Sequence, residues 1–141
     1  MEMEIDLGRV FDTLPAMVWT AQPDGHFDFA NRRWSDYTGL SLDEAHGWEW
    51  QAAVNPDDLP TVLERWRAIL ASGGPGEMEA RIRRFDGKYR WINIECSPMC
   101  DDVGGILKWC GVGTDVDDRR RAEEALSIRG RYASSIVDSI P

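Results

Sequence analysis

Three stretches in the second half of the chain show the alternation of apolar and polar residues that is typical of β-strands. Residues 77–83 place apolar side chains at every second position, and residues 92–97 do the same after an Asp-Gly turn at 86–87. Pro98 ends the second of these runs. Residues 106–114 are apolar on both faces, which predicts a central strand covered on both sides.

The first half of the chain predicts a flanking helix and two short strands. A weak helical pattern over residues 5–14 ends at Pro15. The segments 17–21 and 27–30 are expected to pair as strands around a Pro-Asp-Gly turn.

Helix-start signals follow the second strand. Asn31 and a Ser-Leu-Asp-Glu capping box at 41–44 predict the starts of two short helices. The longest helix of the core is expected next, capped by Asp57 or Asp58 and ending near Ser72. The order of two strands, helices and three strands predicts an α+β fold, with an antiparallel sheet and helices on one face.

Two motifs in the second half of the chain resemble a known family. They are R-R-F-D-G-K-Y-R-W-I, starting at Arg83, and W-C-G-V-G-T-D-V-D-D-R-R-R-A-E-E-A-L, starting at Trp109. Together they resemble the C-terminal half of a PAS sensory domain, in the subclass common in bacterial sensor histidine kinases. The resemblance extends over residues 8–126. It implies a five-stranded antiparallel sheet with the first and last strands adjacent in its middle.

The resemblance also implies where a signal would leave the domain. Asp115, Val116 and Asp117 stand where the family carries an Asp-Ile-Thr-type motif, at the junction of the last strand and an output helix. Asp117 takes the place of the threonine, so the chain departs from the family at this position. Acidic residues in a first helical turn suit the positive end of the helix dipole.

The order of elements divides the chain into four parts. The expected parts are an N-terminal flanking helix at 1–15, a PAS core at 16–116, an output or linker helix at 117–136, and the start of a second PAS-like domain at 137–141. The last interpretation rests on an echo: Ile136–Pro141 resembles Val10–Pro15, 126 residues earlier. The chain is therefore expected to be a piece of a longer protein.

The expected output helix carries the 4-3-4-3-4 spacing of a heptad seam. The seam positions are Ala122, Leu126, Arg129, Ala133, Ile136 and Ile140. Arg129 is a poor seam residue, and Gly130 weakens the helix. The pattern fits a parallel two-helix linker in a homodimer, and it fits equally an amphipathic helix folded back on its own domain.

Composition and charge exclude several kinds of partner. A formal net charge of −9 and a pI of about 4.6 argue against binding to nucleic acid or to acidic lipids. No apolar run reaches the roughly 18 residues of a membrane span, and no leader-type segment opens the chain. Three cysteines without C-x-x-C spacing favour free thiols in a reducing cytoplasm.

Neither a catalytic motif nor a metal-binding motif stands out, so the chain is not expected to be an enzyme. The PAS resemblance brings in cofactors, of which haem and flavin are disfavoured. Light-sensing flavin proteins of the family carry a reactive Cys after the short helices, whereas residues 47–51 here contain none. Haem-binding members usually supply a His from the long core helix, whereas residues 56–72 contain none. The identity of any ligand is unknown from the sequence.

A pocket is expected between the sheet and the helices. The residues expected to line it are Val18, Thr20, Trp34, Val54, Trp66, Met78, Ala80, Ile82, Ile92, Ile94, Cys96, Trp109 and Gly113. Two interpretations stay open: a small cavity for an apolar or aromatic ligand, or a core that these side chains simply fill. Trp91, Cys110 and Val112 are expected on the outer face, against the N-terminal helix or a partner subunit.

Two hypotheses of different kinds follow. In the first, the chain is the sensory and dimerisation module of a larger bacterial signalling protein, a sensor histidine kinase or a diguanylate cyclase. Its partners would be a second copy, bound through the flanking helices, and the downstream domains of the same chain. In the second, the chain is a ligand-free spacer that sets the geometry of a dimer.

Overall fold

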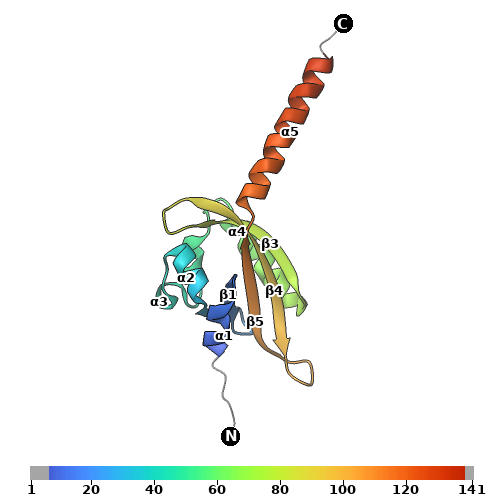
Figure 1. Cartoon of the computed structure of the whole chain (residues 1–141). Coiled ribbons are helices and arrows are strands. Elements are labelled where there is room, and N and C mark those ends of the chain that lie inside the picture. The colour runs from blue at the N-terminus through green and yellow to red at the C-terminus, as the bar shows by residue number, and fades with distance from the viewer. Residues whose placement is uncertain (1–6, 139–141) are drawn as a thin grey trace.

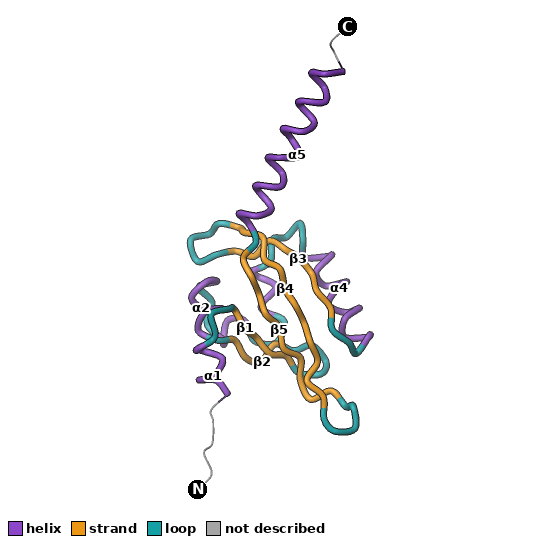
Figure 2. The backbone as a smooth tube through the Cα atoms, turned by 45° about the vertical axis from the view of Figure 1, so that its right-hand side comes forward, coloured by secondary structure: helices purple, strands orange, loops and turns teal. Residues whose placement is uncertain are grey.

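The computed structural model describes the backbone of residues 7–138 and the side chains of residues 8–130. Five antiparallel strands form one sheet in the order β2-β1-β5-β4-β3 (Figure 1, Figure 2). The strands are β1 (Met17–Ala21), β2 (Phe27–Ala30), β3 (Gly76–Arg83), β4 (Tyr89–Cys100) and β5 (Ile106–Asp115). The first and last strands lie side by side in the middle of the sheet. The predicted α+β fold and its strand order are therefore confirmed.

Helix α1 (Leu7–Thr13) precedes β1. The helices between β2 and β3 cover the inner face of the sheet, and they are α2 (Arg32–Thr38), α3 (Leu42–Ala45), the 3-10 helix η1 (Glu49–Ala53) and α4 (Leu59–Ser72). Helix α2 lies next to β1 and α4 next to β3 (Figure 2). Their tryptophans, Trp34 and Trp66, pack against the inward residues Ile92 and Trp109 of the sheet. The core therefore sits between this face and the helices.

Local sequence signals determine the ends of the short helices. Asn31 caps α2, because its Oδ1 accepts a hydrogen bond from the backbone N–H of Trp34 at 3.1 Å. Gly39 ends the helix in the left-handed conformation, with φ of 74°. Ser41 and Glu44 form the predicted capping box at the start of α3.

Helix α4 departs from the usual capping pattern. Asp58 occupies the N-cap position, as one of the two expected caps, but its carboxylate makes no capping hydrogen bond. The carboxylate binds the guanidinium of Arg81 on β3 instead, at 2.7 Å from Nη2 and 3.0 Å from Nε. This contact joins residues 23 positions apart, which no rule for helix ends can anticipate.

The buried side chain of Asn31 ties the N-terminal segment to the sheet. Its Oδ1 also accepts from the N–H of Val18 at 3.0 Å. Its Nδ2 donates to the carbonyl oxygens of Phe11 at 2.9 Å and Ala16 at 2.8 Å. With the bond from Trp34, every hydrogen-bonding position of the amide is used, so burial of this polar group costs little.

Tryptophan side chains fill much of the space between the sheet and the helices. Trp66 of α4 meets Trp19 of β1 and Trp109 of β5 edge to face, with ring centroids 5.5 and 5.8 Å apart. The indole of Trp19 lies across Gly111 of β5, where a Cβ would come within 2.0 to 2.5 Å of ring atoms. Only glycine leaves room for the indole at this position.

Helix α5 (Asp117–Asp138) leaves the sheet at the end of β5 and projects away from the body of the domain (Figure 1, Figure 2). Leu126 and Ile128 on this helix are 67% and 57% exposed. The interpretation of a helix folded back on its own domain is therefore wrong for the described part of α5. The predicted two-helix seam stays a prediction, because its side chains beyond residue 130 lie outside the described residues. Of the expected second-domain start at 137–141, the backbone of residues 137 and 138 belongs to α5, and residues 139–141 lie outside the described residues.

Replacement of Gly111 by Ala is expected to lower the free energy of unfolding by about 1–3 kcal/mol, because the new methyl group must displace the Trp19 indole. Gly74→Ala is the matched control, since a Cβ there meets nothing within 4 Å. The control should change stability by less than about 0.5 kcal/mol. Urea unfolding of both variants measures the difference, and equal stabilities would contradict this account of the core.

Candidate ligand cavity and signal junction

A small apolar cavity lies between the inner face of the sheet and the helices. Its volume is about 80 Å³. The lining residues are Met17, Trp19, Ala21, Gly25, Phe27, Trp34, Thr38, Trp50, Ala53, Val54, Val62, Trp66, Met78, Ile82, Ile92, Ile94 and Gly113. Both the strands and the helices contribute walls, so the cavity is sensitive to how these two layers sit on one another.

Most of the residues expected in a pocket meet around this cavity. Those that line it are Trp34, Val54, Trp66, Met78, Ile82, Ile92, Ile94 and Gly113. Ala80, Cys96 and Trp109 lie on the same face of the sheet and are fully buried, but they pack into the core beside the cavity.

Val18 and Thr20 lie on the other face of the sheet, so their prediction as pocket residues is wrong. Gly113, which lines the cavity, pairs with Met17 of β1. Residues directly opposite one another in an antiparallel pair share a face, so Met17 and Trp19 point inward and the two predicted residues point outward. Four of the five residues of β1 are buried and Trp19 is half-buried, so alternation of polarity could not reveal its inward face. The pairing with Gly113 could have done so.

Thr38 supplies the one side-chain hydroxyl among the cavity-lining residues, and this hydroxyl is already used. Its Oγ1 donates to the carbonyl oxygen of Trp34 at 3.0 Å and accepts from the N–H of Leu40 at 3.2 Å. Drug-sized ligands occupy pockets of roughly 300–1,000 Å³. The present cavity has room for a few water molecules or for one small apolar molecule.

The three cysteines are free thiols that differ in exposure. Cys96 is buried, Cys110 is half-buried and Cys100 is exposed. Burial raises the pKa of the Cys96 thiol to about 12, and it raises the pKa of Cys110 above its ordinary value. Neither of these two is poised as a reactive thiolate near neutral pH. Among the residues that the structure describes, no cluster of His, Cys, Asp and Glu could hold a metal ion, and no helix could cross a membrane.

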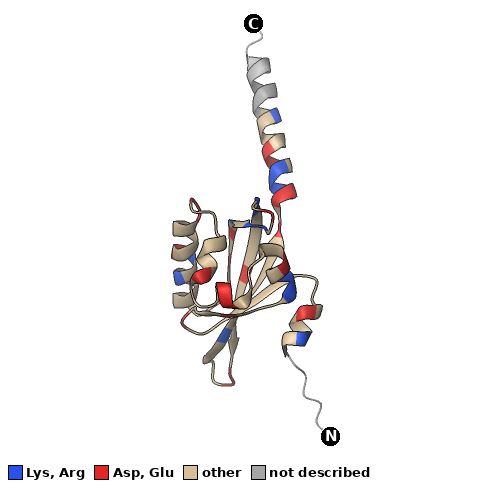
Figure 3. Cartoon of the chain, turned by 90° about the vertical axis from the view of Figure 1, so that its left-hand side faces the viewer, with Lys and Arg blue, Asp and Glu red and all other residues tan. Residues whose placement is uncertain are grey.

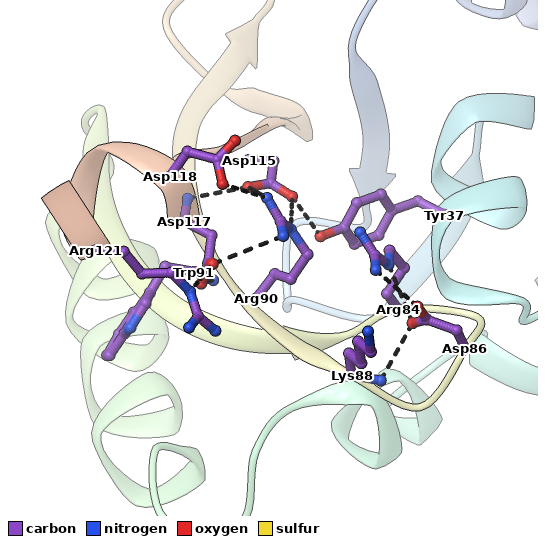
Figure 4. Close-up of polar contacts among 10 residues, drawn as sticks. All are labelled: Tyr37, Arg84, Asp86, Lys88, Arg90, Trp91, Asp115, Asp117, Asp118 and Arg121. Carbon is purple, nitrogen blue, oxygen red and sulfur yellow. Dashed lines mark hydrogen bonds and ion pairs between the residues drawn. The ribbon is translucent and has the colours of Figure 1, made fainter.

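A second group of functional side chains lies where β5 ends and α5 begins (Figure 4). The carboxylate of Asp115 accepts hydrogen bonds from the hydroxyl of Tyr37 at 2.8 Å and from Nε of Arg90 at 2.6 Å. It also accepts from the backbone N–H of Asp117 at 3.0 Å. Helix α2, strand β4 and helix α5 therefore meet on one carboxylate.

Asp117 begins α5 and is only 1% exposed. Its Oδ1 accepts from the backbone N–H of Trp91 at 3.1 Å, and its Oδ2 pairs with Arg121 one turn later (Figure 4). The N–H of Val116 donates to the carbonyl oxygen of Trp91 at 2.8 Å, so this end of β4 holds the junction by backbone bonds as well. A threonine in place of Asp117 could not make the ion pair with Arg121.

Arginine side chains keep these carboxylates charged. Burial alone would raise the pKa of Asp115 and of Asp117. The hydrogen bonds from Arg90 and from Arg121, respectively, together with backbone N–H donors and the nearby positive charge, outweigh it and hold both pKa values below the ordinary 3.8. Burial, together with the bond to Asp115, raises the pKa of Tyr37, so its hydroxyl remains a donor. Charged residues gather in the first turns of α5, next to this junction (Figure 3).

The junction and the cavity share walls. Ile92 lines the cavity and pairs with Asp115 across the sheet. Tyr37 belongs to α2, which contributes Trp34 and Thr38 to the lining. A shift of α2 or of β4 would therefore change the contacts of Asp115.

Sequence reasoning identified the acidic side of this junction and missed its donors. Asp115, Val116 and Asp117 lie between strand and helix, as expected. Arg90 lies inside the motif that starts at Arg83, so the sequence offered a signal by which this donor could have been found. Tyr37 is 78 residues away from Asp115, and nothing local marks it.

Replacement of Asp115 by Asn should destabilise the domain by about 1 kcal/mol near neutral pH, because the charge-assisted bonds from Arg90 are weakened at a partly exposed site. The folded-state pKa of Asp115 is depressed, so its contribution is complete above pH 3.8 and is lost as the pH falls through the folded pKa. Urea unfolding from pH 7 to pH 3 should show the two proteins converging on acidification. A difference that is constant over this range would contradict the assignment, and Asp102→Asn in an exposed turn is the control.

A family model described as PAS fold matches residues 27–113 of the chain. The chain is 36% identical to the uncharacterized protein y4lL of Sinorhizobium fredii over 127 residues, which are 90% of this chain and 15% of that protein. It is 34% identical to the peroxide stress-activated histidine kinase mak1 of Schizosaccharomyces pombe over 127 residues, which are 89% of this chain and 8% of that protein. The chain therefore spans only a small part of these relatives.

A solved structure gives the same result at the level of the fold. The crystal structure of a sensory box histidine kinase/response regulator from Burkholderia thailandensis superposes with a TM-score of 0.66 at 25% identity. The match covers 85% of this chain and 91% of that one. Sheet order, helix placement and the family match agree, and the chain belongs to the PAS family as a sensory domain.

Proposed function

We propose that this PAS domain receives a signal at or near its cavity and passes it through Asp115 into α5, as the input module of a larger histidine kinase. One observation carries the proposal: Asp115 accepts hydrogen bonds from a helix and a strand that wall the cavity, and from the first residue of α5. The 34% identity to mak1 supports kinase output, although the chain spans only 8% of that protein. The free thiols of the chain suit the reducing cytoplasm, where we place this function.

The mechanism rests on two arrangements of α2 relative to the sheet. In one, Tyr37 and Arg90 both bind Asp115, as in the structure. In the other, Tyr37 withdraws, and the carboxylate is held from the strand side alone. Because the same carboxylate accepts the N–H of Asp117, the first turn of α5 follows the change. A ligand shifts this equilibrium only as far as it binds one arrangement better than the other.

A homodimer would carry the change onward. Two α5 helices running in parallel could pass on a rotation or a shift to a downstream domain. The exposure of Leu126, a position of the predicted seam, supports such pairing, because an isolated helix gains nothing from exposed apolar side chains.

The reactivity of the buried thiols bears on which kind of signal the domain receives. The relative mak1 is named for activation by peroxide stress. In this chain, burial raises the pKa of Cys96 and Cys110, which slows their reaction with oxidants. We therefore do not assign the signal to oxidation of Cys96 or Cys110. The apolar lining of the cavity suits a small apolar ligand, and a neighbouring domain is the other source of a signal.

A second candidate function is a ligand-free spacer that sets the geometry of a dimer. The volume of about 80 Å³ favours it, because large side chains already fill most of the space between the layers. In this case the signal would enter from neighbouring domains and still leave through Asp115.

A kinase fusion tests the junction. Residues 1–141 are joined in helical register to the catalytic part of a histidine kinase, and autophosphorylation is measured. Asp115→Ala should change the rate roughly threefold or more, since a charge-assisted hydrogen bond contributes about 1–2 kcal/mol to the balance between arrangements.

Asp86→Ala is the matched control for this fusion. Asp86 forms a similar two-point pair with Arg84, at 2.7 and 3.1 Å, but in the β3–β4 turn and without contact to α5. Its loss should leave the rate unchanged. A normal rate for Asp115→Ala would refute the junction, and an equal effect of both variants would show a general loss of folding.

Native mass spectrometry separates the two candidate functions. From the size of the cavity we expect the purified chain to carry no bound group as large as haem or flavin. A small added mass that leaves on denaturation would favour a chemical sensor, and a bare chain would favour the spacer. An added mass of cofactor size would contradict the cavity analysis.

A further inference from the structure

A separate set of contacts reaches α5 on the outer face of the sheet. Two guanidinium groups lie over the Trp91 ring, with the Cζ of Arg120 3.7 Å from the ring centroid and that of Arg81 5.2 Å from it. Both distances are within the range of cation–π attraction. Trp91 and Arg81 are directly opposite one another on β4 and β3, so this half of the stack is part of the sheet.

Arg120 supplies the helical half of the stack. It lies in the first turn of α5, where its N–H donates to the carbonyl oxygen of Val116 at 3.0 Å. Its Nη1 also lies 3.5 Å from the carboxylate of Glu79 on β3. The planar guanidinium can stack on the indole and meet the carboxylate at its edge, which fixes the rotation of the helix about its own axis.

The sheet half of the stack is held by α4. The carboxylate of Asp58 takes both Nη2 and Nε of Arg81 and also accepts the backbone N–H of Arg81 at 2.8 Å. These bonds lower the pKa of Asp58, and the nearby charge of Arg120 adds to the effect. The Asp58 carboxylate makes these bonds with Arg81 and makes no capping hydrogen bond at the start of α4. Helix α4 carries Val62 and Trp66 of the cavity wall.

We propose that the stack Arg81–Trp91–Arg120 positions α5 on the sheet and, through Asp58, couples it to α4. This inference rests on the proposed signalling function and adds a second contact to it. Asp115 couples the output helix to α2 and β4, whereas the stack couples it to α4. The cavity is thus connected to α5 through two of its helical walls, α2 and α4.

The position of α5 can be measured on the chain itself. One spin label is placed on the exposed Cys100 and one on a cysteine at Glu124, with Cys110 replaced by Ser. Pulsed electron resonance then gives the distribution of distances between the sheet and the helix. Arg120→Gln should shift or broaden this distribution.

Arg119→Gln is the matched control. Arg119 is the neighbouring residue, carries the same charge and also pairs with Glu79, but it contacts no ring. Its distribution should match that of the parent chain. If Arg120→Gln also matches the parent chain, the stack does not position α5 and the proposal is wrong.

Conservative variants separate stacking from charge and from folding. Arg120→Lys keeps the charge but loses the planar stack, and Trp91→Leu keeps apolar bulk but loses the ring. Both should reproduce the Arg120→Gln distribution while leaving the urea midpoint close to that of the parent, because Trp91 and Arg120 are half-exposed. A parental distribution for Arg120→Lys would assign the effect to charge alone and would overturn the stack.

The kinase fusion tests the coupling to α4. Arg120→Gln and Asp58→Asn should each change autophosphorylation by roughly two- to fivefold, and the double variant should change it no further. Additive effects would show that Asp58 does not act through the stack.

The same fusion distinguishes failure of the stack from failure of the proposed function. If Asp115→Ala leaves the rate unchanged, the proposed function is wrong. A response to Asp115→Ala without a response to Arg120→Gln refutes the stack alone.

Discussion

A carboxylate removed from water must be matched by donors, and the arrangement around Asp117 follows from this requirement. The backbone N–H of Trp91 and the side chain of Arg121 supply the match from the sheet and from the helix. Arg90 stands between Asp115, Asp117 and the more exposed carboxylate of Asp118, so one guanidinium faces three negative charges. Helix α5 can therefore begin only where these partners meet. Its start is set by tertiary contacts as much as by its own sequence.

The arrangement of side chains on the inner face of the sheet follows from a different constraint, which is close packing. Trp19 occupies the space that the missing side chain of Gly111 leaves, and Trp66 closes over it. The cavity of about 80 Å³ is what remains after these rings are placed. Its size is therefore sensitive to the tilt of α4 and α2, which carry the aromatic walls. The layers that enclose the cavity are the same layers that hold the junction.

Much of the fold follows from local signals, and the exceptions have identifiable causes. Capping residues, turns and alternating strands give the elements, and the family motifs give the strand order. The inward face of β1 could not be read from polarity, because Val18 and Thr20 are as buried as the residues that face the cavity. The partner of Asp58 is likewise hidden from sequence rules, because a long-range ion pair replaces the local cap. Long-range choices of this kind require the sheet register.

The central place of β5 also orders the events of biosynthesis. β1 and β4, synthesised earlier, each leave one edge unpaired until residues 106–115 arrive between them. Exposed strand edges invite pairing with other chains. A nascent chain must therefore keep both edges apart until its last strand has left the ribosome, and such non-local pairing is slow. Because α5 follows β5 in the chain, residues 106–115 can pair with both edges while α5 is being synthesised.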